Sequence, residues 1–265
     1  MTTVFPDPST GISSRAVTPL PWAWGDAFRQ EAWRAGKIGG MNLLAIETST
    51  ESGSVALWRN GQLLRLSCPV GVPHSETLLP LIREILCEGG MRFADLDGLA
   101  FGAGPGAFTG LRVACGVAQG LAVAHALPVV PVGTLDALAL ASGGDKVIVT
   151  LDARMAEVYH ACFVDGQALE SVAVASPSEV PLPESAGWLA CGNGLLAYPL
   201  LRERLAPWVR EWRPNLMPDA GAVACLAATR LARGEGVDAA GVAPLYVRNK
   251  VAQTVVERLA SGGKA

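Results

Sequence analysis

The glycine-rich segment 102–107, with the sequence GAGPGA, has the residue types best suited to contact a phosphate group. It satisfies the pattern G-x-G-x-x-G/A, in which glycines allow backbone amides to approach a pyrophosphate at the start of a helix. A dinucleotide site also needs an acidic residue about 20 positions later, and residues 121–134 contain none. No Lys-Ser/Thr pair completes a Walker A loop. The segment therefore predicts neither a Rossmann site nor a P-loop.

Other catalytic patterns are incomplete. His74-Ser-Glu76 has the H-x-E order of zinc deaminases, but the P-C-x-x-C that would complete their metal site is missing. The sequence contains neither G-x-S-x-G nor H-E-x-x-H. Its three histidines are far apart, and its six cysteines lie at least 19 residues from one another, which fits buried thiols in a reducing cytosol. We expect no metal site and no catalytic residue.

The composition is that of a folded domain. Half of the 265 residues are hydrophobic, 17% are charged and the net charge is −3, without a basic run. Independent nucleic-acid binding is therefore disfavoured, because it relies on clustered Lys and Arg. The apolar stretch 113–132 is long enough to cross a bilayer, but it includes Gln119, His125 and Pro128. We interpret it as a buried helix followed by a strand, and we expect a cytoplasmic protein with no membrane contact.

The sequence pattern of residues 41–144 predicts a first α/β domain. Residues 1–40 have four prolines and no apolar period, so they are expected to be a disordered extension or the result of an upstream start codon. An antiparallel three-strand meander follows, with Asn60-Gly61 as a hairpin turn. The remaining elements alternate between helix and strand. The expected strands are 43–47, 54–58, 62–67, 98–101 and 129–132, and the expected helices are 74–88 and 109–124.

The sequence pattern of residues 145–243 predicts a second α/β domain of the same type. Turn signals at 152–154 and 165–166 separate expected strands at 147–151, 157–164 and 168–174. Helices are expected at 195–205 and 220–233. The last segment, 244–265, can return to either half, the first domain being one of the two options, and we expect its tail to be disordered.

Two halves that each begin with three antiparallel strands resemble the actin-like ATPase and sugar-kinase superfamily, which has a ribonuclease H-like fold. Five motifs make the resemblance closer, and in combination they are similar to the TsaB (YeaZ) family of tRNA threonylcarbamoyladenosine biosynthesis proteins. Weaker similarities follow in the second half, and coverage runs from about residue 41 to 252. The motifs are LAIETS at 44–49, GSVAL at 53–57, HSETLLP at 74–80, GAGPGAFTGLR at 102–112 and GVAQGLA at 116–122.

The resemblance implies a non-catalytic paralogue of TsaD, the transferase that attaches threonylcarbamoyl to the adenosine beside the tRNA anticodon. It implies pairing with a TsaD-type transferase, joined by a TsaE-type ATPase, with tRNA contacted through the complex. A homodimer is possible when the partner is absent. Thr134 and Leu138 align with the two metal-binding histidines of TsaD-like enzymes, and neither a hydroxyl nor an isobutyl group replaces an imidazole. No cofactor is expected on this chain alone, although ATP or ADP and magnesium can belong to the complex.

Two sets of candidate site residues follow from the resemblance. Thr48, Ser49, Gly104 and Gly106 are weak nucleotide candidates, because Thr48 places a branched side chain where phosphate-binding relatives need close backbone approach. The residues expected at the partner interface are His74, Glu76, Leu79, Arg112, Gly116 and Gly120.

The helix expected at 109–124 carries small residues in two rows at i, i+4 spacing. Either both rows pack on the domain's own sheet, or one row packs there and the other contacts TsaD. Two other functions remain open: a sugar-kinase-like phosphotransferase and a glycoprotease-like metallopeptidase. The rows are Gly110, Ala114, Ala118 and Ala122, and Gly116, Gly120 and Ala124.

Overall fold

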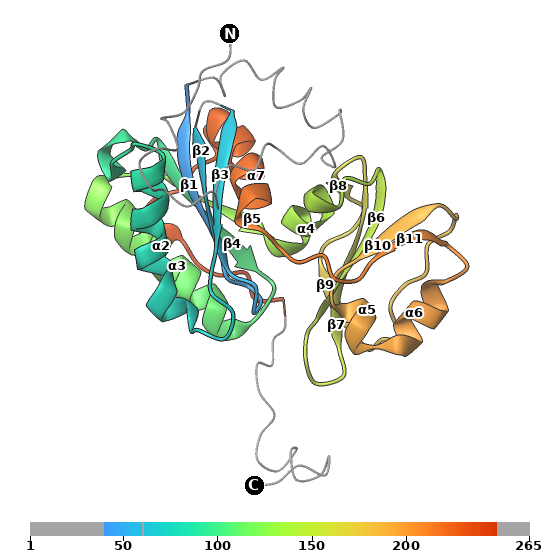
Figure 1. Ribbon diagram of the computed structural model, residues 1–265. Helices are drawn as coiled ribbons and strands as arrows, with labels where there is room; N and C mark the ends of the chain where they lie inside the picture. Colours follow the sequence, from blue (N-terminus) through green and yellow to red (C-terminus); the bar gives the residue numbers. More distant parts are fainter. Residues whose placement is uncertain (1–39, 60, 248–265) are drawn as a thin grey trace, which may run out of the picture.

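The computed structural model describes residues 40–59 and 61–247, which form two α/β halves, each built on a mixed sheet (Figure 1). The first sheet has the order β3-β2-β1-β4-β5, with β1 to β3 antiparallel and β4 and β5 parallel to β1. Its strands are β1 (Asn42–Glu47), β2 (Ser54–Arg59), β3 (Gln62–Ser67), β4 (Gly98–Gly104) and β5 (Val129–Gly133).

The second sheet repeats this topology. Its order is β11-β10-β6-β7-β8, with β7 antiparallel to β6 and with β10 and β11 parallel. β9 also pairs with β7. This duplicated arrangement confirms the predicted actin-like ATPase and sugar-kinase fold. The strands are β6 (Lys146–Asp152), β7 (Val158–Val164), β8 (Gln167–Ala168), β9 (Ala173–Ala175), β10 (Trp188–Cys191) and β11 (Val209–Arg213).

Two helices cover the outer face of the first sheet (Figure 1). α2 (His74–Glu88) has the predicted bounds, and α3 (Phe108–His125) is one residue longer at each end than predicted. Leu78, Ile82 and Ile85 are completely buried, as expected for i, i+3, i+4 spacing on the core-facing side of a helix. The apolar period therefore fixed which side of α2 faces the sheet.

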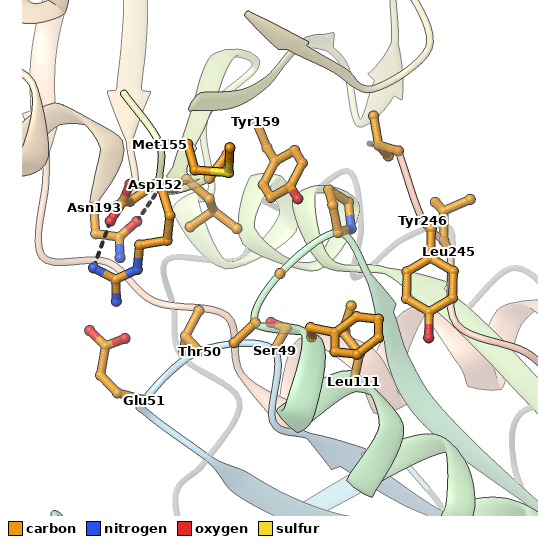
Figure 2. A pocket seen from close by; sticks show the side chains of 18 residues that line it. Ser49, Thr50, Glu51, Leu111, Asp152, Met155, Tyr159, Asn193, Leu245 and Tyr246 are labelled. Carbon is orange, nitrogen blue, oxygen red and sulfur yellow. Dashed lines mark hydrogen bonds and ion pairs between the residues drawn. The ribbon is translucent and has the colours of Figure 1, made fainter. Parts of the chain in front are cut away.

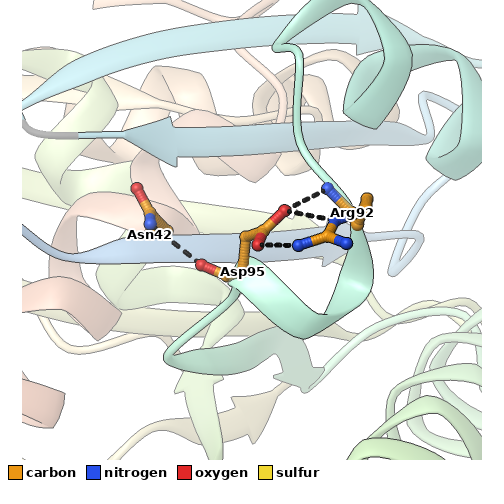
Figure 3. A network of polar contacts seen from close by, with 3 residues as sticks. All are labelled: Asn42, Arg92 and Asp95. Atoms are coloured by element: carbon orange, nitrogen blue, oxygen red, sulfur yellow. Dashed lines mark hydrogen bonds and ion pairs between the residues drawn. The ribbon is translucent and has the colours of Figure 1, made fainter.

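A polar network ties the segment after α2 to the first strand (Figure 3). The Asp95 carboxylate in η2 (Phe93–Asp95) accepts hydrogen bonds from the backbone N–H and the guanidinium of Arg92. The Asn42 side chain donates to the Asp95 carbonyl over 2.9 Å. These contacts hold the turn that leads into β4.

The structure corrects the expected boundary of the second domain. α7 (Ala220–Ala232) falls within 145–243, yet it packs against the inner face of the first sheet. The Ala220 N–H donates to the Ser54 hydroxyl over 2.9 Å, and Asp219 forms an ion pair with Arg65 of β3. Because its residues are mostly small and apolar, α7 can lie close to the strands it covers. The chain therefore returns to the first half after β11.

One buried helix escaped prediction. α4 (Thr134–Ser142) lies between the two halves, and its apolar residues belong to the cores of both. Its sequence, TLDALALAS, is apolar on most sides, so it has no amphipathic period to reveal it. Gly143 ends it in a left-handed conformation (φ +64°).

The second half departs from the prediction in three places. The strand expected at 168–174 is split into β8 and β9, and β10 and β11 were not predicted. The helix expected at 195–205 is split into α5 (Gly194–Ala197) and α6 (Pro199–Leu205). Pro199 explains this break, because proline has no N–H and disfavours the helical conformation of the residue before it, Tyr198.

The described part of segment 244–265 contacts both halves. The Leu245 N–H donates to the Ala103 carbonyl over 2.7 Å, whereas Val247 packs on the core of the second half. We call residues 244–247 the C-terminal strap. The predictions for residues 1–39 and 248–265 lie outside the described residues. Within the described ranges, no helix has both the length and the apolar character needed to span a membrane.

Candidate functional site

A cavity of about 310 Å³ lies between the two halves, at the C-terminal ends of β1 and β6. We call it the interdomain cleft (Figure 2). Ligands of open α/β sheets bind at this edge, beyond the carboxyl ends of the strands. Its lining comes from the turn after β1 (Ser49, Thr50, Glu51), the loop 105–108 with Leu111, the turn after β6 (151–155) with Tyr159 and Asn193, and the strap residues 245–247.

The backbone of the turn after β1 packs directly against the glycine-rich loop and the start of α3. A Cβ on Gly106 would collide with the carbonyl of Ser49, and one on Gly110 would collide with the carbonyl of Thr48. The Ala107 N–H donates to the Ser49 carbonyl over 2.6 Å. These glycines are therefore required by the turn after β1, which lies where a phosphate would otherwise approach the amides.

The four nucleotide candidates are not equally placed. Thr48 is completely buried, and its hydroxyl donates to the Gly110 carbonyl over 2.8 Å. Ser49 and Gly106 line the cleft, but Thr48 and Gly104 do not. Gly104 has a φ of +119°, and a Cβ there would lie 2.7 Å from the Leu245 carbonyl. Thr48 therefore holds α3 and offers nothing to a ligand.

Glu47 is a buried carboxyl group beneath this turn. One of its oxygens accepts the Ser49 N–H over 2.5 Å, and the other lies against Gly102 without a hydrogen-bond partner. Burial raises the pKa of Glu47 to about 7, because an ionised carboxylate loses its hydration there. Glu47 does not line the cleft and cannot reach a ligand in it.

The second half supplies the opposite wall. The Asp152 carboxylate accepts the Tyr198 hydroxyl and the Arg154 N–H, each over 2.8 Å, and pairs with the Arg154 guanidinium at 3.0 Å. The Asn193 side-chain oxygen accepts the Asp152 N–H over 2.9 Å. These groups therefore position one another on this wall.

The two small-residue rows of α3 lie on different sides of the helix. Gly110, Ala114, Ala118 and Ala122 are buried against the sheet, whereas Gly116, Gly120 and Ala124 are exposed. A Cβ on Gly116 or Gly120 would meet nothing within 4 Å. Two large apolar side chains, one on α2 and one on α3, are also exposed, and we call them and the exposed row the partner face because a partner is expected there. It consists of Leu79 (45% exposed), Val123 (68%), Gly116, Gly120 and Ala124.

The other expected interface residues divide into three cases. Glu76 is exposed on α2. The His74 imidazole is half-buried, with Nε2 2.9 Å from the Thr50 carbonyl and Nδ1 buried, so both ring nitrogens face the protein. Arg112 is exposed, but its Nε donates to the Tyr246 hydroxyl over 3.2 Å. Arg112 therefore joins α3 to the C-terminal strap.

Comparison with known proteins identifies the family. The chain is 36% identical to the tRNA threonylcarbamoyladenosine biosynthesis protein TsaB of Escherichia coli over 227 residues, which is 80% of this chain and 96% of that protein. It is 33% identical to TsaB of Haemophilus influenzae, over 80% of this chain and 95% of that protein. The chain belongs to the TsaB family.

Structural comparison agrees. The crystal structure of YeaZ from Pseudomonas aeruginosa superposes with a TM-score of 0.72 and 39% identity, over 78% of this chain and 99% of that one. Residues 71–176 also match the family model of TsaD, described as tRNA N6-adenosine threonylcarbamoyltransferase. This central segment of the TsaB-family chain is therefore similar to the transferase family.

Thr134 and Leu138 of this TsaB-family chain are both completely buried in the core around α4. Neither reaches the cleft. Among the residues that the structure describes, no group of three or more His, Cys, Asp or Glu could hold a metal ion.

Several cleft residues were not identified from the sequence. Glu51, Asp152, Asn193 and Tyr246 line the cleft. Glu51, Asn193 and Tyr246 lie in turns or loops, and Asp152 is the last residue of a strand. Asp152 had one usable signal: it ends β6, the counterpart of β1, which ends at Glu47. Asn193 follows β10, which was not predicted, so its position had no basis in the sequence.

Proposed function

We propose that this TsaB-family chain is a non-catalytic subunit in tRNA threonylcarbamoyladenosine formation, which supports a TsaD-type transferase by binding it through the partner face. A TsaE-type ATPase would join this pair, and tRNA would be contacted through the complex. A homodimer through the same face would form when the transferase is absent. Any ATP, ADP or magnesium would belong to the complex.

The exposed glycines of α3 carry this proposal. A glycine in a helix interior costs up to about 1 kcal/mol relative to alanine. Gly110 is required because the Thr48 carbonyl lies against it, but neither Gly116 nor Gly120 has such a neighbour. A second helix that packs closely against α3 would need both, since small residues let helix backbones approach.

The geometry of the first half supports a non-catalytic role. Phosphoryl transfer needs backbone and metal groups around the phosphates, whereas here the turn after β1 covers the glycine-rich loop. A metallopeptidase needs ligands on its metal, but Thr134 and Leu138 are buried in the core. Both alternatives from the sequence are therefore disfavoured.

The test replaces the exposed glycines. Gly116→Leu and Gly120→Leu should leave the chain folded, because the new side chains project into open space and leucine favours helix. Each should weaken binding to the purified TsaD-type protein at least 100-fold, measured by calorimetry. Gly241→Leu is the matched control, because Gly241 is also exposed with nothing within 4 Å of its Cβ position.

The cellular readout is the amount of threonylcarbamoyladenosine in tRNA after replacement of the natural gene by each variant. Loss with the two α3 variants and normal levels with Gly241→Leu are the expected results. Normal partner affinity of both α3 variants, with unchanged circular dichroism, would remove the partner face from the proposal. Catalysis of the transfer by this chain without the TsaD-type protein would refute the non-catalytic role.

A further inference from the structure

The interdomain cleft holds a carboxylate that the fold does not use. Glu51 is exposed in the turn after β1, and Figure 2 shows its carboxylate directed toward the wall that carries Asp152 and Asn193. Within residues 40–59 and 61–247, no hydrogen bond or ion pair to this carboxylate is found. The Asp152 carboxylate, in contrast, already accepts a hydrogen bond from the Tyr198 hydroxyl and forms an ion pair with Arg154. Glu51 is thus available to a ligand.

The charges of the cleft favour a cation over an anion. Its lining includes two acidic residues, Glu51 and Asp152, and one basic residue, Arg154, which gives a formal charge of −1. Arg154 is paired with Asp152. In the glycine-rich loop, the Ala107 amide already donates to the Ser49 carbonyl in the turn after β1, which also lies against Gly106. A phosphate would therefore meet the Glu51 carboxylate, and the one basic residue of the lining, Arg154, already pairs with Asp152.

Apart from Ser49, Thr50 and Asn193, most of the remaining lining is apolar or aromatic. Phe108 and Tyr246 lie with ring centroids 5.6 Å apart, and the Arg112 guanidinium lies 3.9 Å above the Phe108 ring. The hydrogen bond from Leu245 to Ala103 fixes the strap beside these rings. Leu111 and Met155 add aliphatic surface. Such walls suit an alkyl chain, and aromatic faces attract a nearby ammonium group.

We propose that the interdomain cleft binds a small aliphatic amine, with its ammonium on the Glu51 carboxylate and its alkyl stem against the apolar wall. The cavity, about 310 Å³, is at the lower end of the range for small-molecule sites. The ammonium can belong to a free amine or to the lysine side chain of another protein, since both present the same group. The site is separate from the partner face, so either proposal can fail without the other.

The binding test uses the full chain and four probes. Pentane-1,5-diamine represents a free amine, Nα-acetyl-lysine amide represents a lysine side chain, pentane-1,5-diol is the neutral analogue, and magnesium ATP is the anion. Calorimetry should give a Kd for at least one amine that is 10-fold lower or more than the Kd of the diol. The tighter of the two amines indicates the source. No binding of either amine, or tighter binding of ATP that displaces them, would overturn the proposal.

Two variants locate the contact. Glu51→Gln should remove the difference between diamine and diol, because it keeps the side-chain shape and removes the charge. Glu184→Gln removes the same charge from an exposed position outside the cleft, and should leave the difference unchanged. Equal losses in the two variants would mean nonspecific charge attraction and would overturn the site. Circular dichroism confirms that both variants are folded.

Discussion

The carbonyl oxygen of Ser49 occupies the space that a side chain on Gly106 would need. The same carbonyl accepts the Ala107 N–H over 2.6 Å. The last glycine of the GAGPGA segment is thus explained by contact between two loops of one chain. This contact closes the first half at the edge where related folds admit phosphate.

Gly106→Ala should therefore destabilise the chain. The new methyl group would force the turn after β1 away from α3, and we expect a loss of roughly 1–3 kcal/mol in the free energy of unfolding, typical of overpacking. Urea denaturation measures it. Gly241→Ala is the control, because its methyl group enters open space. Equal stability of the two variants would show that the loop has room, and a phosphate site would then need to be reconsidered.

Glu47 makes stability depend on pH. Its pKa is raised by burial from 4.5 to about 7, so the folded state holds this proton more tightly than the unfolded state. Stability should therefore fall as pH rises from about 4.5 to 7, by at most roughly 3 kcal/mol, and stay low above that. The glutamine in Glu47→Gln cannot ionise, so the variant should show a weaker dependence of stability on pH. Its free energy of unfolding, relative to that of the natural chain, should be higher at pH 8 than at pH 5.

Urea denaturation of both proteins at pH 5, 6, 7 and 8 gives the comparison. The informative quantity is how the difference between variant and natural chain changes with pH, since a fixed difference reports only on the amide group itself. A difference that stays constant from pH 5 to 8 would mean that Glu47 does not titrate in this range.

The sequence predicted the first half well because its elements have clear local signals. α2 shows one apolar face, and the Asn60-Gly61 dipeptide in the sequence predicted the hairpin that pairs β2 with β3. The prediction failed where the apolar pattern of the sequence is uniform or interrupted. α4 and α7 are apolar on most sides, so neither the existence of α4 nor the sheet that α7 covers could be read from a period.

The site was harder to predict than the fold. The glycine-rich loop was identified, but its covering by Thr48 and Ser49 depends on contacts between segments about 60 residues apart. His74 and Arg112 were expected at an interface because of their motifs. The inward contact of His74 with Thr50 and the surface contact of Arg112 with Tyr246 follow from packing alone. Side-chain direction at such positions is not encoded in local spacing.

Gly53 should be intolerant of a side chain for a reason that involves His74. A Cβ there would lie 2.6 Å from the His74 ring and 2.8 Å from the Cys68 sulfur. Gly53→Ala should displace the imidazole, break its contact with the Thr50 carbonyl and lower stability by roughly 1–3 kcal/mol. Adding Cys68→Ala makes room on one side, so the double variant should recover part of the loss. Strict additivity in thermal melts would contradict this geometry.

The hydroxyl of Tyr246 should hold the C-terminal strap in place. It accepts a hydrogen bond from Arg112, and the neighbouring Leu245 N–H donates to Ala103. Tyr246→Phe removes only the hydroxyl and keeps the ring contact with Phe108, so the strap should open more often without unfolding the chain. Hydrogen exchange of the Leu245 amide should then accelerate by roughly 3- to 10-fold, as expected when one hydrogen bond worth about 1 kcal/mol is lost.

Tyr198→Phe removes a hydroxyl bonded to Asp152 in the second half and serves as the control. Unchanged exchange at Leu245 in the Tyr246 variant would mean that ring packing alone fixes the strap. Faster exchange confined to this variant would show that α3, which carries the partner face, also controls one wall of the interdomain cleft.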